Sequence, residues 1–471
     1  MRLAAAGAAA CALAACETIA PERDDPAESR QPIPEPPAIR IPDGERAPVI
    51  GRQQPDLGTA PPELGVEPGR AEPPEITLTR PESADGGPPR QTVALLLPLS
   101  GDARDLGGAM RRAAHLALMD VADERFEVVV RDTRGTREGA KTAARRAVDA
   151  GANLILGPVF SDSVRAVKPV ATAARVPVLA FSNNPRVAES GVYVMGHMPG
   201  PQVRRIVGFA RGRGLESFGA LVPENTYGEI VREALTRAAR RGGADTRVRA
   251  FAPDAPDKSG PIKALGEYDK RREKLRERIA ELKDGPGEPP EDELEALKRK
   301  DTLGPAPFDA VLVPLGGETL KTVAPMMAYH DIDPGKVRYL GISTWNDPSL
   351  GTEPSLNGGW FAAPSPQGWN RFRDRYKARY GADPRRLASL AYDATALAAV
   401  LARRAEPDAR GGPRVYAQDK LTQPSGFAGV DGLFRLTDSG RVERRYAVME
   451  MRRDELKVLD PAPDSFRAVT N

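Results

Sequence analysis

Residues 91–119, QTVALLLPLSGDARDLGGAMRRAAHLALM, decide the fold of this chain. Residues 93–97 form an apolar run of strand length that ends at Pro98, and Gly101 supplies a tight turn directly after it. Beyond the turn, apolar residues recur at helical spacing, as Met110, Ala114 and Leu118 do. The stretch therefore predicts a strand, a Ser-Gly loop and a helix, which together are the first half of a βαβ unit.

The same alternation of strand-length runs and helical periods continues along the chain. The predicted strands are residues 93–97, 126–130, 153–156, 177–181, 192–194, 217–222, 246–251, 308–314, 338–342 and 359–363. The predicted helices are residues 107–121, 137–150, 162–174, 201–212, 227–241, 320–330, 368–380 and 387–405. A final hairpin is predicted at residues 432–436 and 444–451. Alternation on this scale predicts an α/β protein whose mainly parallel sheets are flanked by helices.

Length and charge narrow the functional classes. A chain of 471 residues is long enough for two or three domains. Its 68 Lys and Arg residues nearly balance 65 Asp and Glu residues, which leaves a formal net charge of +3. A dedicated nucleic-acid binder would carry a one-sided basic excess, so we expect no nucleic-acid partner.

The N-terminal sixteen residues, MRLAAAGAAACALAAC, have the shape of a secretory signal. Their last four residues resemble the bacterial lipoprotein cleavage signal, which predicts a signal peptide over residues 1–16 and lipid attachment at Cys16. Cleavage of a plain signal peptide after a small residue is the alternative. Cys11, the only other cysteine, would be removed with the signal. By resemblance to enteric sorting rules, Glu17 favours anchoring to the outer membrane on its periplasmic side.

A segment rich in Pro, Glu, Arg and Gly follows, over residues 17–90. It shows no sustained apolar periodicity, so it predicts a disordered tether with polyproline character. At about 3.1 Å per residue, such a tether would reach on the order of 200 Å when fully drawn out. A lipid anchor on a tether of this kind suits a protein that reaches across a gap, although a simple spacer has the same composition.

A second composition shift occurs at residues 261–302, which are highly charged. Apolar residues recur there at i, i+3, i+4 and i+7, and a Gly-Pro-rich break follows at residues 285–290. The pattern predicts a helical hairpin inserted into the second half of the fold. Such a hairpin could dock a partner protein or could be a solvated surface insertion, and the sequence leaves both open.

Small polar residues gather where the predicted strands end. In an open parallel sheet these ends meet at one edge, where ligands bind. Hydroxyls and helix N-termini suit a carboxylate or another polar ligand, whereas a glutamate suits an ammonium group. Some of these residues could instead cap helices, as Ser161 or Asp162 and Asn225 would. The candidate cleft residues are Ser100, Ser161, Ser182, Asn183, Tyr227 and Glu318.

Motifs for metal or covalent chemistry are absent from the sequence. The three histidines, His115, His197 and His330, have no metal-binding spacing and are expected to be structural or on the surface. The sequence contains no GxSxG elbow, Walker loop, HExxH motif or dinucleotide fingerprint. We therefore expect a protein that is not an enzyme and needs no metal and no cofactor.

Six segments in order carry a family resemblance. They are VALLLPLSGDARDLGGAMRRAAHLAL, ANLILGPVFSDSV, VPVLAFSNN, ENTYGE, SLAYDATALAAVL and GFAGVDGLFRLTDSG. Together they resemble the type I periplasmic binding-protein family of leucine/isoleucine/valine-binding proteins, and within it the lipoproteins called penicillin-binding protein activators. The resemblance implies two lobes joined by three crossovers near Gly196, Gly359 and Gly426. Lobe 1 would comprise residues 91–196 and 360–425, and lobe 2 residues 197–359 and 426–471.

The resemblance also implies roles for the cleft residues. Ser161 resembles the hydroxyl that binds a ligand carboxylate, and Ser182 with Asn183 occupies the next ligand loop. Tyr227 matches a cleft tyrosine, and Glu318 approximates the acidic partner of a ligand amine. Because the Pro-rich tether replaces the helical-repeat domain of the well-known activator, the mode of partner docking would differ.

Three functions are compatible with this pattern. The first expectation is an outer-membrane lipoprotein that activates a penicillin-binding peptidoglycan synthase. The alternative is a substrate-binding lipoprotein of an amino-acid or amide ABC transporter. A ligand sensor without a transport partner would use the same cleft. A small polar ligand between the lobes belongs to the last two functions and is compatible with the first.

Overall fold

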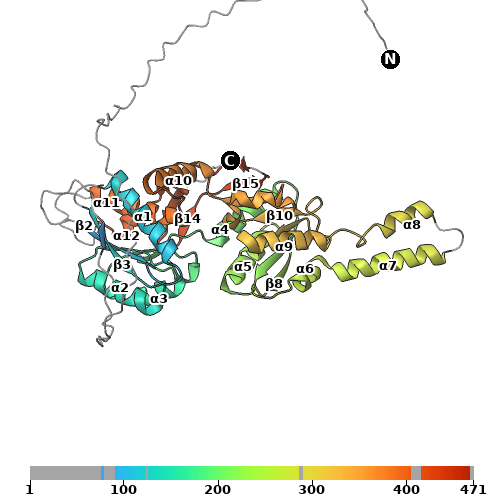
Figure 1. The fold of residues 1–471 in the computed structure, drawn as a ribbon, viewed down its shortest axis with the longest axis horizontal. Coiled ribbons are helices and arrows are strands. Elements are labelled where there is room, and N and C mark those ends of the chain that lie inside the picture. The colour runs from blue at the N-terminus through green and yellow to red at the C-terminus, as the bar shows by residue number, and fades with distance from the viewer. Residues whose placement is uncertain are drawn as a thin grey trace, which may run out of the picture. The chain divides into compact units, whose positions relative to one another are not determined.

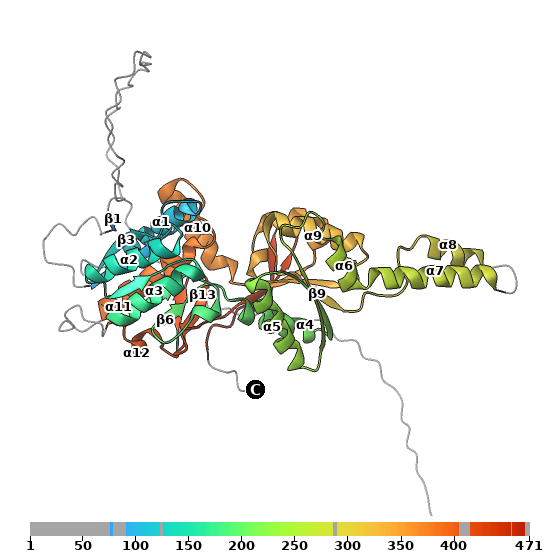
Figure 2. The ribbon, with the colours of Figure 1, turned by 90° about the horizontal axis from the view of Figure 1, so that it is seen from below.

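Two large sheets flanked by helices, together with one small three-stranded sheet, make up the described part of the chain (Figures 1 and 2). The structure is a computed structural model that describes residues 76–78, 91–122, 126–285, 290–404, 415–453 and 455–466. The predicted signal peptide, Cys16 and most of the predicted tether lie outside the described residues. Each large sheet forms one lobe, and the predicted α/β two-lobed architecture is confirmed.

The sheet of lobe 1 has six strands within the described residues, in the order β1-β3-β2-β4-β5-β6. The strands are β1 (Ile76–Leu78), β2 (Gln91–Leu97), β3 (Phe126–Asp132), β4 (Leu154–Leu156), β5 (Val178–Ala180) and β6 (Val192–Val194). All neighbours from β3 to β6 are parallel. Residues 93–97 of β2 are completely buried. This continuous apolar run is expected where helices cover both faces of a parallel sheet.

Strand β1 corrects the prediction of a disordered tether over residues 17–90. Its three residues pair antiparallel with β3, and Ile76 lies opposite Val130. Without this partner, the outer side of β3 would present unpaired N–H and C=O groups at the sheet edge. Three residues are too few to show a period-2 pattern, so sequence analysis missed this strand.

Helices from two distant parts of the chain cover the sheet of lobe 1. They are α1 (Arg104–Val121), α2 (Arg137–Asp149), α3 (Ser161–Ala174), α10 (Pro366–Tyr380), α11 (Ala388–Arg404) and the short α12 (Gln418–Leu421). Helix α11 packs along α1 and is buried over most of its length. A small antiparallel sheet completes the lobe, with β12 (Phe427–Gly429), β13 (Gly432–Leu436) and β14 (Val442–Arg444).

The sheet of lobe 2 has seven strands within the described residues, in the order β16-β15-β11-β10-β9-β7-β8. The strands are β7 (Ser217–Pro223), β8 (Asp245–Phe251), β9 (Ala310–Leu312), β10 (Arg338–Gly341), β11 (Trp360–Ala363), β15 (Ala447–Met451) and β16 (Leu456–Asp460). The strands from β8 to β11 are parallel, whereas β15 and β16 add an antiparallel edge. Helices α4 (Pro199–Arg211), α5 (Thr226–Arg240), α6 (Ser259–Gly266) and α9 (Gly317–Tyr329) belong to this lobe.

The chain crosses between the lobes three times, after β6, after β11 and after β14. The first crossing lies near Gly196, at the place expected for it. The second follows Ala363, because β11 pairs with β10 in lobe 2. The third lies between β14 and β15 instead of near Gly426, because Phe434 and Val442 are buried in the core of lobe 1. A period-2 pattern predicts a strand but not the sheet that it joins, which explains both displaced boundaries.

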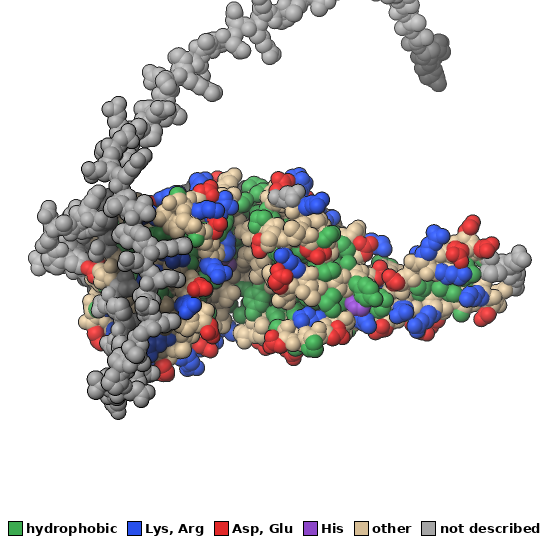
Figure 3. Space-filling view, viewed as in Figure 1, with side chains coloured by type: hydrophobic (Ala, Val, Ile, Leu, Met, Phe, Trp, Pro, Cys, Tyr) green, Lys and Arg blue, Asp and Glu red, His purple; other side chains and the backbone are tan. Residues whose placement is uncertain are grey.

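The charged insertion starts later than predicted. Helix α6 packs on the sheet of lobe 2, where Ile262 and Leu265 are buried in its core. Only α7 (Tyr268–Asp284) and α8 (Glu291–Lys298) form the hairpin, which extends away from the lobe (Figures 1 and 2). Positive and negative side chains are interspersed along its surface (Figure 3). A helical hairpin is therefore present, and it begins at Tyr268 instead of residue 261.

Candidate ligand-binding site

Ser161 is the first residue of α3, at the carboxyl end of β4. The N-cap residue of this helix is Phe160, which makes no side-chain cap hydrogen bond. The prediction that Ser161 or Asp162 caps the helix is therefore wrong. The start of α3 combines a half-buried hydroxyl with the partial positive charge of a helix N-terminus, which together suit an anion.

Ser182 and Asn183 follow β5, the neighbouring strand in the sheet. Ser182 is buried, and its Oγ accepts a hydrogen bond from the backbone N–H of Asn184 at 3.2 Å. The carbonyl of Ser182 accepts from Gly196 N–H at 3.1 Å, which ties this loop to the first crossover. Asn183 is exposed. The buried hydroxyl shapes the loop, and the exposed amide is the group available to a ligand.

Ser100 lies at the end of β2 and donates a hydrogen bond of 2.6 Å from Oγ to Asp132 Oδ2. Asp132 Oδ1 accepts from the N–H groups of Leu99 at 2.8 Å and Arg134 at 2.7 Å. Burial opposes ionisation of Asp132, but these hydrogen bonds hold the pKa of its carboxyl below the ordinary value. Ser100 therefore supports a loop around Asp132. Asp132 is the last residue of β3, two positions beyond the predicted strand 126–130, and it was not among the predicted site residues.

Tyr227 comes from lobe 2, in the first turn of α5. Its hydroxyl donates to the carbonyl of Pro314 at 3.1 Å, which joins the loops after β7 and β9. Burial raises the pKa of Tyr227, so the phenol is neutral at physiological pH. Asn225 caps the same helix, because its Oδ1 accepts from Gly228 N–H at 3.1 Å. The predicted capping role of Asn225 is confirmed.

Glu318 lies in the first turn of α9, and its side chain is 89% exposed. Its carboxylate is 3.3 Å from Lys321 Nζ, one turn further along the helix. The structure therefore pairs this glutamate with a lysine of its own helix. It does not hold Glu318 against Tyr227 or against the residues of lobe 1.

An ion-paired arginine brings the two sheet edges together. Arg186 follows the ligand loop of lobe 1, and its two terminal nitrogens lie 3.3 Å from Glu229 and 3.4 Å from Glu233 of α5. The loop after β5 is thereby held against the helix that begins at the end of β7. The four candidate residues of lobe 1 follow the carboxyl ends of its strands, and Tyr227 follows the carboxyl end of β7 in lobe 2. A cleft is expected between two such edges.

A buried charged cluster beside the crossovers was not predicted. Asp431, between β12 and β13, is completely buried. It accepts from Arg386 at 2.6 Å and from Ser389 Oγ at 2.7 Å, and its Oδ2 lies 3.1 Å from His197 Nε2. Burial disfavours the charge of Asp431, but Arg386 and His197 lower its pKa well below the ordinary value. His197 was expected to be structural or on the surface, and its contact with the buried Asp431 agrees with a structural role.

Two members of the cluster lie directly on crossovers. His197 is on the first, between β6 and α4, and Arg444 ends β14 just before the third. Arg444 donates to the carbonyl of Met195 at 2.9 Å and thereby joins these two crossovers. The other two histidines lie elsewhere: His115 Nδ1 is 3.0 Å from the hydroxyl of Tyr380, and His330 packs edge-on against Tyr268. The cluster therefore stabilises the connection between the lobes.

The described ranges contain neither a candidate metal site nor a candidate membrane-spanning helix. No group of three or more His, Cys, Asp or Glu side chains there is arranged to hold a metal ion. Likewise, no helix in the described part of the chain combines the length and apolarity needed to cross a bilayer.

Comparison with known proteins agrees with the fold. Residues 90–269 match the family model described as periplasmic binding protein. A curated relative, an uncharacterised protein of Rickettsia prowazekii (strain Madrid E), is 24% identical over 183 residues, which cover 39% of this chain. The match spans 47% of the relative's length, or about half.

Solved structures cover the described lobes more fully. A leucine-binding protein of Thermotoga maritima is 18% identical with a TM-score of 0.55, covering 79% of this chain and 98% of its own. A solute-binding protein of an ABC transporter from R. palustris, in complex with benzoate, is 17% identical with a TM-score of 0.52, covering 79% and 97%. The chain therefore has the two-lobed fold of periplasmic binding proteins, and residues 90–269 carry a domain of that kind.

Proposed function

We propose that this protein is a substrate-binding protein that captures a small carboxylate between its lobes and delivers it to an ABC transporter. The observation that carries the proposal is Ser161 at the start of α3. The N-cap residue Phe160 makes no side-chain hydrogen bond to the first-turn N–H groups of this helix. The first-turn N–H groups and the serine hydroxyl can donate to a carboxylate. The fold shared with ABC transporter solute-binding proteins supports the same function.

Closure of the lobes would complete the site. Asn183 adds an exposed amide from the neighbouring loop, and Tyr227 adds a neutral phenol from lobe 2. Hinge motion of the two lobes around the crossovers would bring these groups onto one ligand. Because Glu318 is paired with Lys321, the residues favour a carboxylate that needs no acidic partner for an amine. Benzoate, bound by the R. palustris protein, is a ligand of this class.

Thermal unfolding with added carboxylates tests this function. Leucine, isoleucine and benzoate would each be added to the full chain, and a ligand at a hundredfold excess over its Kd stabilises by about 2.7 kcal/mol. We expect at least one of them to raise the melting temperature, with benzoate raising it most. Ser161→Ala should abolish the increase, whereas Ser190→Ala, an exposed serine of the same lobe, should retain it. Stabilisation by none of the three carboxylates would reject the proposal.

A second candidate function is activation of a penicillin-binding peptidoglycan synthase, and the α7–α8 hairpin is the observation that favours it. Its base is fixed by the buried Arg271, which donates to Thr302, to Asp331 and to the carbonyl of Gly266. A hairpin held at its base and projecting from lobe 2 presents an extended charged surface to another protein. Such a surface is the form expected of a docking element.

Synthase binding separates this candidate from transport. The full chain and a variant lacking residues 273–299 would be mixed with detergent-solubilised penicillin-binding proteins, and glycan polymerisation would be followed. Activation by the full chain and its loss in the deletion variant would favour the second candidate. An unchanged polymerisation rate would count against it. In either case we propose a lipid anchor at Cys16, for which Cys16→Ala should abolish labelling by a radioactive fatty acid. Placement of this anchor in the outer membrane belongs to the second candidate, because delivery to an ABC transporter requires access to the inner membrane.

A further inference from the structure

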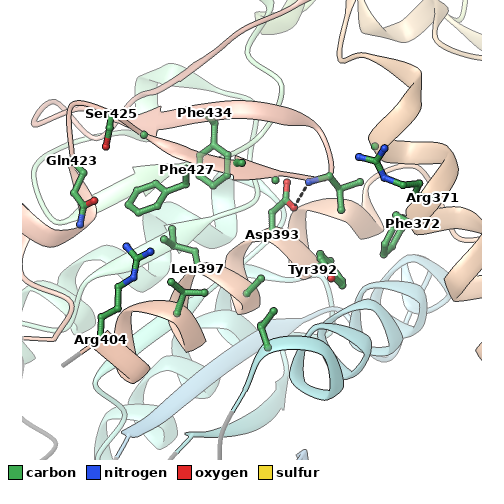
Figure 4. Close-up of a pocket in the computed structure, with 18 of the residues that line it drawn as sticks. Arg371, Phe372, Tyr392, Asp393, Leu397, Arg404, Gln423, Ser425, Phe427 and Phe434 are labelled. Carbon is green, nitrogen blue, oxygen red and sulfur yellow. Dashed lines mark hydrogen bonds between the residues drawn. The ribbon is translucent and has the colours of Figure 1, made fainter. Parts of the chain in front are cut away.

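A groove in lobe 1 lies outside the interlobe cleft. It has a volume of about 620 Å³ and runs between α10, α11 and the segment that contains β12 (Figure 4). We call it the lobe-1 groove and define it by Arg371, Asp393, Leu397, Arg404, Phe427 and Phe434. Ligand pockets in proteins generally range from about 300 to 1,000 Å³, so the groove is large enough for a small molecule.

The middle of the groove is apolar. Leu397 and Val400 come from the face of α11 that lines it, and Phe427 and Phe434 come from the small sheet. The ring centroids of Phe427 and Phe434 lie 5.8 Å apart. In Figure 4 these two rings lie on one side of the groove and Leu397 lies on the other. Mainly apolar walls with a few polar groups are the usual composition of a small-molecule site.

Two arginines, Arg371 and Arg404, lie at opposite ends of the groove, and Gln423 and Ser425 also line it (Figure 4). Within the part of the chain that the structure describes, Arg371 and Arg404 have no hydrogen-bond or ion-pair partner and are exposed. Arg375 also lines the groove, but its guanidinium is paired with Asp120. The two available guanidiniums give each end of an apolar groove an uncompensated positive charge.

Asp393 adds a buried polar atom between these ends. Its side chain is 3% exposed, and Oδ1 accepts from Val430 N–H at 2.7 Å. Oδ2 has no hydrogen-bond partner among the described residues. Burial and the charge of Asp431 raise the pKa of Asp393 to about 7, so a large share of it is neutral near physiological pH. A neutral acid does not repel an anionic ligand, which leaves the arginines to determine the charge preference.

From these groups we infer that the lobe-1 groove is a second ligand site, which binds an elongated, mainly apolar carboxylate. The apolar walls take the body of the ligand, and Arg371 or Arg404 pairs with its carboxylate at one end. A carboxylate at each end would engage both arginines. The site belongs to lobe 1 alone, so it is independent of lobe closure and of the substrate-binding function proposed above.

Calorimetric titration of the full chain with octanoate tests the site, with octanamide as the uncharged ligand of the same length. Because the single carboxylate of octanoate pairs with one arginine at a time, we expect the double variant Arg371→Gln/Arg404→Gln to weaken octanoate binding about three- to tenfold, as loss of one exposed charged hydrogen bond would. Octanamide binding should change little. Arg403→Gln is the matched control, because Arg403 is the exposed neighbour of Arg404 and does not line the groove.

Two further variants make the outcome decisive. Ala396→Phe places a ring in the groove and should abolish binding of both octanoate and octanamide at an unchanged melting temperature. Ser161→Ala should leave octanoate binding intact, because that serine belongs to the interlobe cleft. The inference is overturned by absence of octanoate binding, by its loss in Ser161→Ala, or by an effect of the double variant Arg371→Gln/Arg404→Gln no larger than that of Arg403→Gln.

Discussion

Asp431 shows how the connection between the lobes depends on a single buried carboxylate. It accepts hydrogen bonds from Arg386 and Ser389 and contacts His197, and no part of it reaches solvent. Removing one member of a buried charged set leaves the others unpaired, which costs far more than loss of a surface ion pair. The cluster should therefore contribute strongly to the folding of lobe 1.

We predict that Asp431→Asn lowers the free energy of unfolding by about 3 kcal/mol or more, because Arg386 would then lack a buried counter-charge. Urea denaturation at pH 7 measures this change. Asp419→Asn provides the control, since Asp419 is exposed and, among the described residues, forms an ion pair with its neighbour Lys420 alone. A loss for Asp431→Asn as small as that for Asp419→Asn would show that the cluster is not important for stability.

Asp393 predicts a dependence of stability on pH. Its pKa is about 7 in the folded protein, whereas an unfolded aspartate titrates near pH 4 (roughly 3.9). Between these values the folded protein keeps a proton that the unfolded chain has released, so this group lowers stability as pH rises through the window. Asparagine has no such proton to lose.

We therefore expect Asp393→Asn to gain stability relative to the unmodified protein from about pH 4 to pH 7, and to keep a constant advantage above that. Urea denaturation at pH 5, 6, 7 and 8 follows the difference. His197 remains in both proteins, so its own titration largely cancels in the comparison, whereas Asp431 interacts directly with Asp393 and the difference therefore reports on this pair of carboxyl groups. Parallel stability curves for the two proteins would contradict a raised pKa at Asp393.

Predictability at the residue scale follows sequence distance. Ser161, Ser182 and Tyr227 could be predicted because each follows a strand-like run, and the ends of parallel strands gather at one edge. The contact of His197 with Asp431 joins residues 234 positions apart, and no local pattern encodes it. Glu318 was placed correctly after a strand, but its ion pair with Lys321 was not predicted, although the two residues are only three positions apart.

At the scale of elements, α5 shows a cap that the sequence does reveal. Asn225 accepts from Gly228 N–H, and the helix begins directly after it, at Thr226. We predict that Asn225→Ala lowers the free energy of unfolding by about 1 kcal/mol, and that Asn225→Gly lowers it by only a few tenths of a kcal/mol. Chemical denaturation measures both changes. Equal losses for Ala and Gly would show that Asn225 acts through something other than the cap.

The α7–α8 hairpin is predicted to be separable from lobe 2. The backbone N–H of Leu303 bonds to the carbonyl of Arg271, so the two ends of the hairpin already lie together. Replacing residues 273–299 with a short Gly-Ser linker should change the free energy of unfolding by only about 1 kcal/mol, because loop length has a weak effect on closure entropy.

Arg271→Met is the informative contrast to this deletion. It removes the buried guanidinium that donates to Asp331 and Thr302. Asp331 then keeps the hydroxyl of Thr302 as a donor but loses its counter-charge, which should cost about 3 kcal/mol. Thermal and urea denaturation compare the two variants. A larger loss from the deletion than from Arg271→Met would show that the hairpin helices themselves stabilise the lobe.

Most helices and strands were predictable because their apolar periods are long and regular. The three residues of β1 were too short for any period, and α6 was assigned to the insertion because its charged neighbours dominate that window. Membership of a lobe was the weaker part of the prediction. Strands β12 to β14 have the same pattern in either lobe, and only the tertiary packing of Phe434 and Val442 decides between them.

At the scale of the whole described fold, the ligand loop and the first crossover are in direct contact. A Cβ atom added to Gly196 would lie 2.3 Å from the carbonyl oxygen of Ser182 and 2.8 Å from the backbone nitrogen of Asn183. Both neighbours are backbone atoms, which cannot turn aside as a flexible side chain can. Glycine is therefore required at residue 196 if the crossover and the ligand loop are to keep their places.

We predict that Gly196→Ala weakens binding in the interlobe cleft by about tenfold or more, because displacement of the loop by even 1 Å misplaces the groups that hold the ligand. Gly200→Ala, four residues further on, has open space around its added methyl group and should bind normally. Calorimetry would use whichever of leucine, isoleucine and benzoate stabilises the unmodified protein most. Octanoate binding in the lobe-1 groove should be the same in both variants, since the nearest atoms to a Cβ added at Gly196 belong to Ser182 and Asn183, which do not line the groove. If Gly196→Ala kept full cleft affinity, the loop after β5 would not be part of the ligand site, and recognition would have to rest on the start of α3 and on lobe 2.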